Sequence, residues 1–340
     1  MNIIFTVGDC NGIGLECFFK ALKKISKETN FKNVKFFIAG NKNTIYNYAK
    51  KCAFNFFNDN RFNEINQSKI HINNITCEII DCEKYAEVEL GKESKDAGRL
   101  AIASLKYAAA ETLAGRFDAI VTLSVSKNVL YSVGWKFPGQ TEFFANICGV
   151  QKPLMLLFLD NIRVALATIH IPLEQVSKNI TQAKLIEIIE IFNHSLWLDF
   201  CIDKSKIAVL GLNPHAGENR SLGIEEEEII KPAIEHCKKQ GIQAEGPFSS
   251  DGFFGFEEYK KYDGILAMYH DQGLIPLKLL SNGNGVNFSA GLPIVRCSPD
   301  HGTGFAIAGK NLANELSTYN ALLSAISIAQ SRQQRAVDNG

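Results

Sequence analysis

Short runs of apolar residues alternate along the chain with longer stretches in which apolar residues recur at helical spacing. Several of the short runs are apolar throughout, which is typical of strands buried on both faces of a mostly parallel sheet. The alternation of strands with helices predicts an α/β fold. We expect strands at Ile3–Val7, Val34–Ala39, Ile75–Ile80, Ala119–Leu123, Leu154–Leu159, Val164–Ile169, Ile207–Leu212, Ile265–Tyr269 and Leu292–Val295.

Three helices are predicted clearly between these strands. One is capped by Ser94 and runs to about Ala114, and a second covers Gln182–Leu198 with its apolar residues on one face. The third, Ile224–Gln240, opens with the acidic run Glu225–Glu228 and closes with lysines, which matches a helix dipole. We interpret the acidic run as a solvated first turn. Residues 55–74 are rich in asparagine without a clear period, and we expect a surface excursion there.

Length, charge and cysteine usage exclude several classes of protein. The 340 residues leave room for about two domains, and 36 basic residues balance 36 acidic ones. The chain therefore lacks the basic surface of a general nucleic-acid binder, and no apolar run reaches the roughly 20 residues of a membrane-spanning helix. We see no signal peptide, and the nine cysteines form no CxxC pair. We expect a cytoplasmic protein with reduced, mostly buried thiols.

Three histidines, His170, His215 and His270, directly follow predicted strands. In open α/β sheets, ligands gather at the carboxyl ends of the strands. Three imidazoles at that edge could hold one divalent metal ion and leave a coordination position for substrate. Asp271 follows His270 and could orient an imidazole or bind substrate. For each histidine, a structural role satisfied by hydrogen bonds remains the alternative.

Basic and polar residues gather in the last third of the chain. Lys278, Asn287 and Arg296 lie within or beside apolar segments. Because unpaired buried charge is costly, the two cations need an anion, which is either an internal carboxylate or the phosphate or carboxylate of a ligand. The segment GDCNGIG at residues 8–14 is typical of a tight strand-to-helix turn or of a weak phosphate loop. No GxGxxG, Walker A or GxSxG motif occurs.

Eight segments taken together resemble the PdxA family of 4-hydroxythreonine-4-phosphate dehydrogenases. ATIH, NPHAGE and MYHDQG are the most specific, whereas residues 41–90 match poorly. The segments appear in the family's order and are GDCNGIGLE (8–16), VSKNV (125–129), PGQTEFF (138–144), VALATIHIPL (164–173), GLNPHAGE (211–218), LAMYHDQGLIPLK (266–278), GVNFSAGLPIVR (285–296) and SPDHGTGFAIAGK (298–310).

The resemblance implies an isopropylmalate-dehydrogenase-like fold of two α/β domains with a cleft between them. Residues 1–136 and 311–340 would form a discontinuous first domain, and residues 137–310 a second domain that carries metal, substrate and dimer contacts. It also implies a homodimer with shared active sites, in which His170 and His215 come from one subunit and His270 from its partner.

The activity implied by the resemblance is an NAD- or NADP-dependent oxidation of 4-phosphooxy-L-threonine. Decarboxylation to 3-amino-2-oxopropyl phosphate would follow, in vitamin B6 (pyridoxine 5'-phosphate) biosynthesis. One alternative is a sister dehydrogenase of 4-phospho-D-erythronate or 4-phospho-D-threonate, which would recognise a hydroxyl instead of an amine. Others are a metal-dependent aldolase or hydrolase, which needs no NAD(P), and a non-catalytic binding protein.

The family's motifs also imply roles for single residues. The metal ligands, for zinc, magnesium or cobalt, would be His170, His215 and His270. The substrate-binding positions would be Gln140, Thr141, Lys278, Asn287 and Arg296, and the catalytic ones Asp251, Asp271 and Lys278. The cofactor loop would contain Gly302, Thr303 and Gly309. Gln140 replaces the family's usual histidine, and a glutamine can donate to phosphate but cannot carry a proton.

Overall fold

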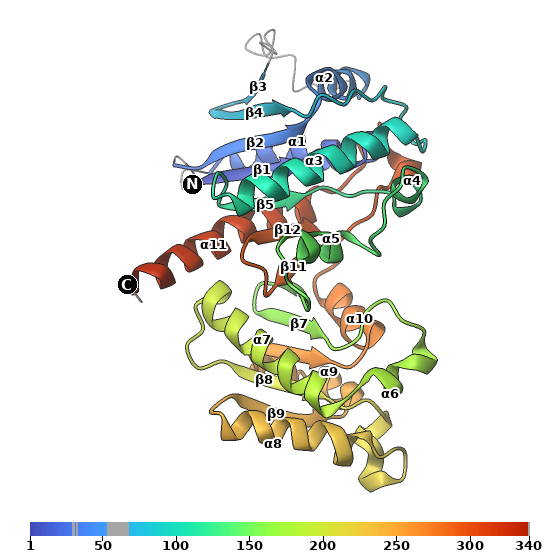
Figure 1. Ribbon diagram of the computed structural model, residues 1–340, viewed down its shortest axis with the longest axis vertical. Coiled ribbons are helices and arrows are strands. Elements are labelled where there is room, and N and C mark those ends of the chain that lie inside the picture. The colour runs from blue at the N-terminus through green and yellow to red at the C-terminus, as the bar shows by residue number, and fades with distance from the viewer. Residues whose placement is uncertain (29–30, 32, 53–67, 339–340) are drawn as a thin grey trace. The chain divides into compact units, whose positions relative to one another are not determined.

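The computed structural model describes residues 1–28, 31, 33–52 and 68–338 (Figure 1). The chain forms two compact units. Unit 1 comprises Met1–Gln151 and Leu292–Ala329, and unit 2 comprises Lys152–Gly291 and Gln330–Gly340. The domain boundaries expected from the family were residues 136 and 310. Among the described helices, none has the length and apolar character needed to cross a membrane.

Unit 1 is built on strands in the order β3-β4-β2-β1-β5-β12, which are parallel except for the antiparallel pair β3/β4. The strands are β1 (Asn2–Thr6), β2 (Lys35–Gly40), β3 (Lys69–Ile72), β4 (Ile75–Asp81), β5 (Ala119–Thr122) and β12 (Val295–Pro299). The helices are α1 (Gly14–Ile25), α2 (Lys42–Lys51), α3 (Lys95–Leu113), α4 (Lys127–Ser132), α5 (Gln140–Ile147) and α11 (Leu316–Asp338), of which the last continues beyond this unit.

Strand β1 shows why these runs are apolar throughout. Ile4 belongs to the core cluster that contains residues of α3, whereas the next residue, Phe5, stacks edge-on against Phe18 of α1 with ring centroids 4.8 Å apart. Successive residues of a strand point to opposite faces, so helices cover both faces of β1. Figure 1 shows α3 lying across the strands. Its predicted cap is confirmed, because the Ser94 hydroxyl accepts from the Ala97 amide.

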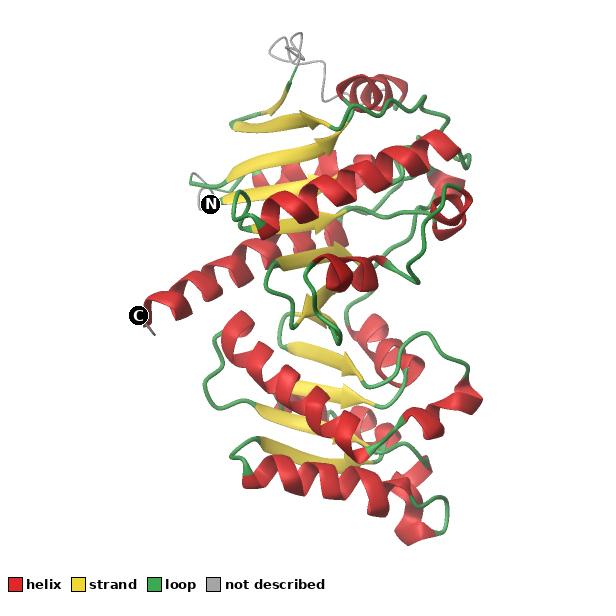
Figure 2. Ribbon diagram, in the orientation of Figure 1, coloured by secondary structure: helices red, strands yellow, loops and turns green. Residues whose placement is uncertain are grey.

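Unit 2 contains strands in the order β11-β6-β7-β10-β8-β9. β6 is antiparallel to both neighbours, and β7, β10, β8 and β9 run parallel. The strands are β6 (Leu154–Leu159), β7 (Ile162–Leu166), β8 (Lys206–Leu210), β9 (Gln243–Phe248), β10 (Gly264–Ala267) and β11 (Val286–Ala290). The helices are α6 (Val176–Asn179), α7 (Gln182–Phe200), α8 (Lys231–Lys239), α9 (Ser250–Gly255) and α10 (His270–Leu280) (Figure 2).

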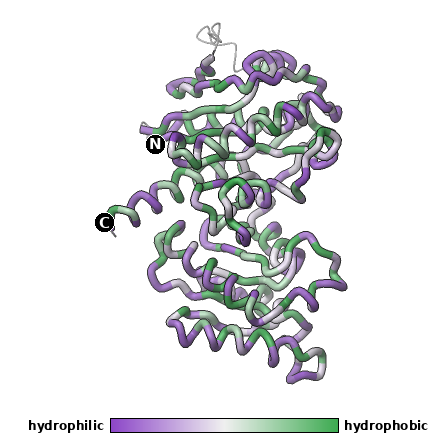
Figure 3. Tube along the Cα trace, in the orientation of Figure 1, coloured by the Kyte–Doolittle hydropathy of each residue, from purple (hydrophilic) through white to green (hydrophobic). Residues whose placement is uncertain are grey.

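Close packing places α10 against the strands of unit 2. A Cβ added to Gly273 of α10 would lie 2.7 Å from Val164 of β7 and 3.0 Å from Ala267 of β10. Only glycine allows this approach, and it brings the first residue of α10, His270, near the end of β7. On the outer helix α8, hydrophobic and hydrophilic residues alternate along the trace in Figure 3, as expected of a helix with one buried face.

Several predicted boundaries are wrong for identifiable reasons. The last strand lies at Val295–Pro299 instead of Leu292–Val295, because Leu292 and Ile294 pack into the core of unit 1 outside the strand. Strands β3, β9 and β11 were not predicted, since they are short or mix polar residues with apolar ones. In the expected excursion at 55–74, Lys69–Ile72 form β3 in an antiparallel pair with β4, while residues 55–67 lie outside the described part.

Candidate active site

The three strands that precede the candidate metal ligands are neighbours in unit 2. Strand β10 pairs in parallel with β7 on one side and with β8 on the other. His170 follows β7, His215 follows β8 and His270 follows β10. Because the carboxyl ends of parallel strands meet at one edge of a sheet, the fold delivers all three histidines to the same edge.

His170 and His270 lie together at this edge. Their ring centroids are 5.8 Å apart and the ring planes are tilted by 42°. His270 Nδ1 lies 2.7 Å from Asp271 Oδ1, which leaves Nε2 of His270 available to another partner. Among the residues that the structure describes, no group of three or more His, Cys, Asp or Glu side chains is already arranged to hold a metal ion.

His215 lies in an unusual turn, η4 (Pro214–Arg220). The backbone of His215, Ala216, Gly217, Glu218 and Asn219 adopts left-handed helical angles, with φ of 51° and ψ of 29° at His215. Left-handed backbone costs roughly 1–2 kcal/mol for each residue that has a Cβ. The surrounding structure must therefore hold the turn in place.

The residue that meets this turn is Glu226, which the sequence interpretation missed. The prediction that Glu225–Glu228 form a solvated first turn is wrong for Glu226, whose exposed fraction is 1%. The side chain is directed inward from a π-helical turn, η5 (Glu226–Ile230), and accepts hydrogen bonds from residues before His215. The acidic residues fitted a helix dipole, and the sequence carries no local signal for a π-helical turn.

Asp251 and Asp271 lie in unit 2 with the histidines. The Ser249 hydroxyl donates to Asp251 over 2.5 Å; this bond, the Gly252 amide and the nearby His215 hold the pKa of Asp251 below its usual value. Asp271 is exposed and bonded to His270. The lowered pKa keeps Asp251 ionised near neutral pH, and either carboxylate could accept a hydrogen bond from a cationic ligand group.

Arg296 forms a buried polar cluster in unit 1. It lies in β12 with 3% of its surface exposed, and its guanidinium donates to Thr122 Oγ1 over 2.6 and 3.0 Å and to Gln140 Oε1 over 2.9 Å. These partners are neutral. Burial lowers the pKa of Arg296 to about 10, so the group remains charged at neutral pH. Thr141 follows Gln140 in the first turn of α5 and is also buried.

Lys278 and Asn287 lie in unit 2. The premise that Lys278 is a buried charge is wrong, because its side chain is exposed near the end of α10. Asn287 lies in β11 with its side-chain Oδ1 buried, and this atom finds no hydrogen-bond partner in the described part of the chain. An unsatisfied buried amide oxygen of this kind can accept from a bound ligand.

The predicted cofactor loop packs against the GDCNGIG turn in unit 1. The amide of Ile13 donates to the carbonyl of Thr303 over 2.8 Å, and a Cβ on Gly12 would lie 2.5 Å from the same oxygen. Gly12 therefore permits a close backbone approach, which favours the strand-to-helix-turn interpretation. Gly302 has no atom within 4 Å of an added Cβ, so its backbone is open, and Gly309 adopts a φ of 77°.

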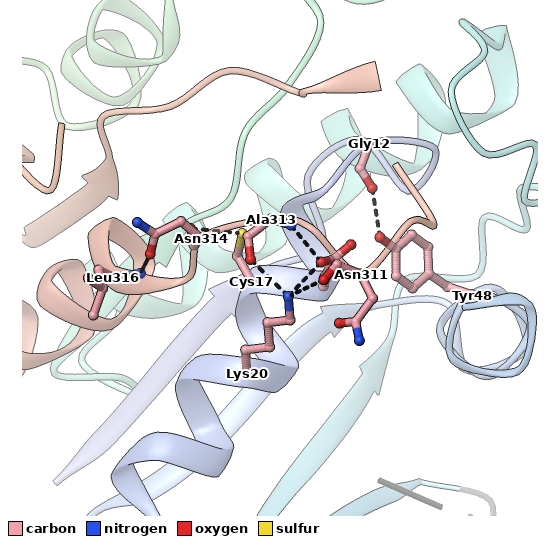
Figure 4. A network of polar contacts seen from close by, with 9 residues as sticks. Gly12, Cys17, Lys20, Tyr48, Asn311, Ala313, Asn314 and Leu316 are labelled. Atoms are coloured by element: carbon pink, nitrogen blue, oxygen red, sulfur yellow. Dashed lines mark hydrogen bonds and ion pairs between the residues drawn. The ribbon is translucent and has the colours of Figure 1, made fainter. Parts of the chain in front are cut away.

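Two residues of α1 hold the chain beyond this loop. Glu16 is fully buried, and its Oε1 accepts from Lys20 Nζ at 2.7 Å and from the Ala313 amide at 2.9 Å. Lys20 also donates to the carbonyls of Ala313 and Asn311 (Figure 4). This pair was not predicted, although a Glu and a Lys four residues apart at the start of a helix are a usable signal.

Asp9 is a further buried carboxyl group beside the GDCNGIG turn. It is 2% exposed, and its amide donates to the Ser124 carbonyl over 2.9 Å. Burial raises the pKa of Asp9 to about 6, against the hydrogen bond from the Asn11 amide and with a smaller contribution from Glu93. A carboxyl that titrates close to neutrality can hold or release a proton at physiological pH.

Comparison with known proteins places the chain in a family. The family model for pyridoxal phosphate biosynthetic protein PdxA matches residues 32–325. Proteins named 4-hydroxythreonine-4-phosphate dehydrogenase are similar over nearly the whole chain. The one from Sulfurihydrogenibium sp. is 38% identical over 98% of this chain and 100% of its own, and that from Bacteroides thetaiotaomicron is 40% identical over 98% and 90%.

A solved structure shows the same fold. The crystal structure of 4-hydroxythreonine-4-phosphate dehydrogenase from Klebsiella pneumoniae superposes with a TM-score of 0.79 at 31% identity, over 96% of this chain and 99% of that one. The predicted α/β fold class is thus confirmed. Because both the family model and the relatives cover most of the sequence, the chain is an oxidoreductase that belongs to the PdxA family of pyridoxal phosphate biosynthetic proteins.

Proposed function

We propose that the protein oxidises 4-phosphooxy-L-threonine with NAD or NADP and releases CO2 to give 3-amino-2-oxopropyl phosphate, as a step of vitamin B6 biosynthesis. The observation that carries this proposal is the delivery of three histidines to the carboxyl edge of β7, β10 and β8, with His170 and His270 in ring contact. The names of the relatives support the substrate.

The histidines fit a divalent ion such as zinc, magnesium or cobalt. His170 and His270 would be two of its ligands. Within one chain their ring centroids lie 5.8 Å apart, whereas in the shared site proposed below His270 would come from the partner subunit. His215 would be the third ligand. Such an ion would lower the pKa of the substrate hydroxyl and stabilise negative charge on that oxygen. Asp271 would keep the His270 ring oriented through Nδ1.

The remaining groups would bind the substrate's two charged ends. The family's motifs imply that Gln140, Thr141, Lys278, Asn287 and Arg296 bind the phosphate and the polar groups beside it. The Arg296 guanidinium can form two parallel hydrogen bonds to a phosphate, whereas Lys278 offers a point charge. Asp251 and Asp271 would accept from the substrate ammonium. We also propose Lys278 and these two carboxylates as the groups that exchange protons with the substrate.

The cofactor would lie along the loop that contains Gly302, Thr303 and Gly309. The open backbone at Gly302 leaves room for a ligand to approach, and the Glu16–Lys20 pair fixes the chain beyond the loop. We therefore propose that this loop binds NAD or NADP without a GxGxxG turn. We also propose the two domains that the family resemblance implies, one of residues 1–136 with 311–340 and one of residues 137–310.

We further propose a homodimer with shared active sites. Helix α10 begins with His270, and its apolar side chains Ile275 and Leu279 are 58% and 73% exposed. They lie four residues apart and share one helical face. Exposed apolar side chains next to a functional residue are typical of an interface, and a partner covering them would bring a second chain to this site.

The runner-up is a sister dehydrogenase of 4-phospho-D-erythronate or 4-phospho-D-threonate. It would use the same phosphate and metal groups but would recognise a hydroxyl instead of an amine. Two carboxylates, Asp251 and Asp271, lie in the unit that carries the histidines, and Asp251 has a lowered pKa. Carboxylates are the natural partners of an ammonium group, which favours the amino substrate.

A substrate screen tests the proposed function. Purified protein, stripped of metal by exhaustive chelation, is assayed with each phosphorylated acid and with NAD or NADP by absorbance of the reduced cofactor. We expect turnover of 4-phosphooxy-L-threonine only after a divalent ion is restored. Full activity in verified metal-free protein would exclude a role of the metal in turnover. Turnover of 4-phospho-D-erythronate or 4-phospho-D-threonate, without turnover of 4-phosphooxy-L-threonine, would favour the sister dehydrogenase.

A second prediction concerns the cofactor loop. Glu16→Ala removes the acceptor for the Ala313 amide and for Lys20, so the chain beyond the loop loses its anchor. We expect the KM for the cofactor to rise about tenfold or more, as for the loss of one charge-assisted hydrogen bond, with kcat much less affected. Steady-state kinetics with varied cofactor measure this. Lys23→Ala, an exposed position on the same helix, is the control. Equal cofactor KM values in the two folded variants would contradict the anchoring role.

A further inference from the structure

We infer that Glu226 is a positioning residue that holds the left-handed turn of His215 and thereby sets the direction of its imidazole. The inference deepens the proposed function, since its consequence for metal binding rests on His215 being a ligand. Its structural part, the dependence of the turn on one buried carboxylate, rests only on the contacts of unit 2.

The turn itself does not favour its own conformation. Five residues in a row, from His215 to Asn219, have left-handed angles, and Arg220 also has a positive φ of 78°. Among them Gly217, and to a lesser degree Asn219, adopt such angles readily. Without external contacts this segment would relax to right-handed or extended backbone, and His215 would move with it.

The Glu226 carboxylate supplies contacts on both sides of His215. Before it, Oε1 accepts from the amides of Leu212 and Asn213 over 2.8 and 2.7 Å, and Oε2 accepts from Asn213 Nδ2 over 2.9 Å. After it, Gly217 packs so closely that an added Cβ would lie 2.7 Å from Oε2. One side chain therefore joins the entry of the turn to its far side.

The π-helical turn explains how this carboxylate is directed inward. An extra residue in a helical turn changes the direction of the side chains around it, and such turns are frequent at functional sites. Here Glu226 is buried, whereas its neighbours form exposed ion pairs, Glu227 with Lys231 and Glu228 with Arg220. Three adjacent glutamates thus have different environments, and only Glu226 touches the segment before His215.

Glu225 supports the same turn from outside. Its Oε2 accepts from Asn213 Nδ2 over 2.8 Å, and its Oε1 accepts from the Ser177 hydroxyl over 2.6 Å. Asn213 is thereby held by two carboxylates. Glu226 differs from Glu225 in that it also accepts from the backbone amides of Leu212 and Asn213. Because an amide without an acceptor is costly when it is removed from water, Glu226 contributes more to the stability of the turn.

The experiment compares Glu226→Ala and Glu226→Gln with Glu227→Ala, a control of the same residue type on the same π-helical turn. Hydrogen exchange of the amides at Leu212 and Asn213 is measured in the full chain without metal. We expect exchange at least 100-fold faster in Glu226→Ala and a smaller increase in Glu226→Gln, which keeps one acceptor oxygen. We expect no change in Glu227→Ala. Unchanged protection in both Glu226 variants would overturn the inference.

Two further readouts separate orientation of His215 from general stability. Titration with Co²⁺ should show at least tenfold weaker binding in Glu226→Ala, and the His215 imidazole signals should shift in NMR spectra of the same protein. If Glu226→Ala does not fold, Glu226→Gln carries the comparison. Faster exchange with unchanged His215 signals and Co²⁺ affinity would refute positioning. If the unaltered protein binds no Co²⁺, the proposed metal site fails, while exchange and the imidazole signals still decide the role of Glu226.

Discussion

Replacing Arg296 by alanine is expected to lower kcat/KM for the phosphorylated substrate by about 10²- to 10⁴-fold, mainly through a higher KM. The estimate follows from two charge-assisted hydrogen bonds to phosphate at roughly 1.5–3 kcal/mol each, with about 1.4 kcal/mol for each factor of ten. Steady-state kinetics with varied substrate measure the effect. No other single substitution in the proposed phosphate site is expected to cost as much.

The surroundings of Arg296 give the physical reason. The guanidinium is almost fully buried, and its bonds to Thr122 and Gln140 go to neutral side chains that hold it without cancelling its charge. Thr122 and Gln140 therefore fix the planar guanidinium in place, and the nearby Glu142 favours its charged form. In the proposed site the guanidinium would form bidentate hydrogen bonds with the substrate phosphate.

Two comparisons make the Arg296 result specific. Arg99→Ala removes an exposed arginine of the same unit, which pairs with Asp96, and should leave KM unchanged. Arg296→Lys keeps the charge but loses the fork, so an intermediate loss is expected. If a folded Arg296→Ala enzyme, with melting checked by calorimetry, retains the original KM, then Arg296 serves only the packing of unit 1.

Mixing two inactive variants, His170→Ala and His270→Ala, is expected to restore about a quarter of the original activity if each site takes His270 from the partner subunit. Random exchange gives half heterodimers, and in each of them one of the two identical sites is intact. Subunits are exchanged, heterodimers are confirmed by native mass spectrometry, and turnover is assayed with metal present. The expected recovery is large because each parent variant lacks a ligand in every site.

The structure makes this experiment decisive. The rings of His170 and His270 are in contact within one chain, 5.8 Å between centroids, which is also compatible with a pair of ligands from the same subunit. The exposed apolar side chains of α10, which starts at His270, favour a partner at this site. No return of activity in confirmed heterodimers would assign both histidines to one chain and leave the metal proposal intact.

The sequence alone determined the elements whose signals are local. The all-apolar run of β1 indicated a strand covered on both faces, and Phe5 and Ile4 indeed pack on opposite sides. Ser94 marked the start of α3. The histidines after three apolar runs were assigned to strand ends, and β7, β10 and β8 are adjacent and parallel. These local patterns predict the elements correctly because burial and capping depend on residues that are close together in the sequence.

Tertiary structure decided what depends on residues distant in the chain. The solvated-turn interpretation of Glu225–Glu228 fitted a helix dipole, yet Glu226 is buried because the amides of Leu212 and Asn213 require its carboxylate. The cluster around Arg296 joins residues more than 150 positions apart, since Gln140 reaches it from α5. Hydrophobic periodicity indicates which face of a helix or strand is buried, but not which polar groups that face will contact. Only the folded chain brings a buried side chain together with hydrogen-bond partners that are distant in the sequence.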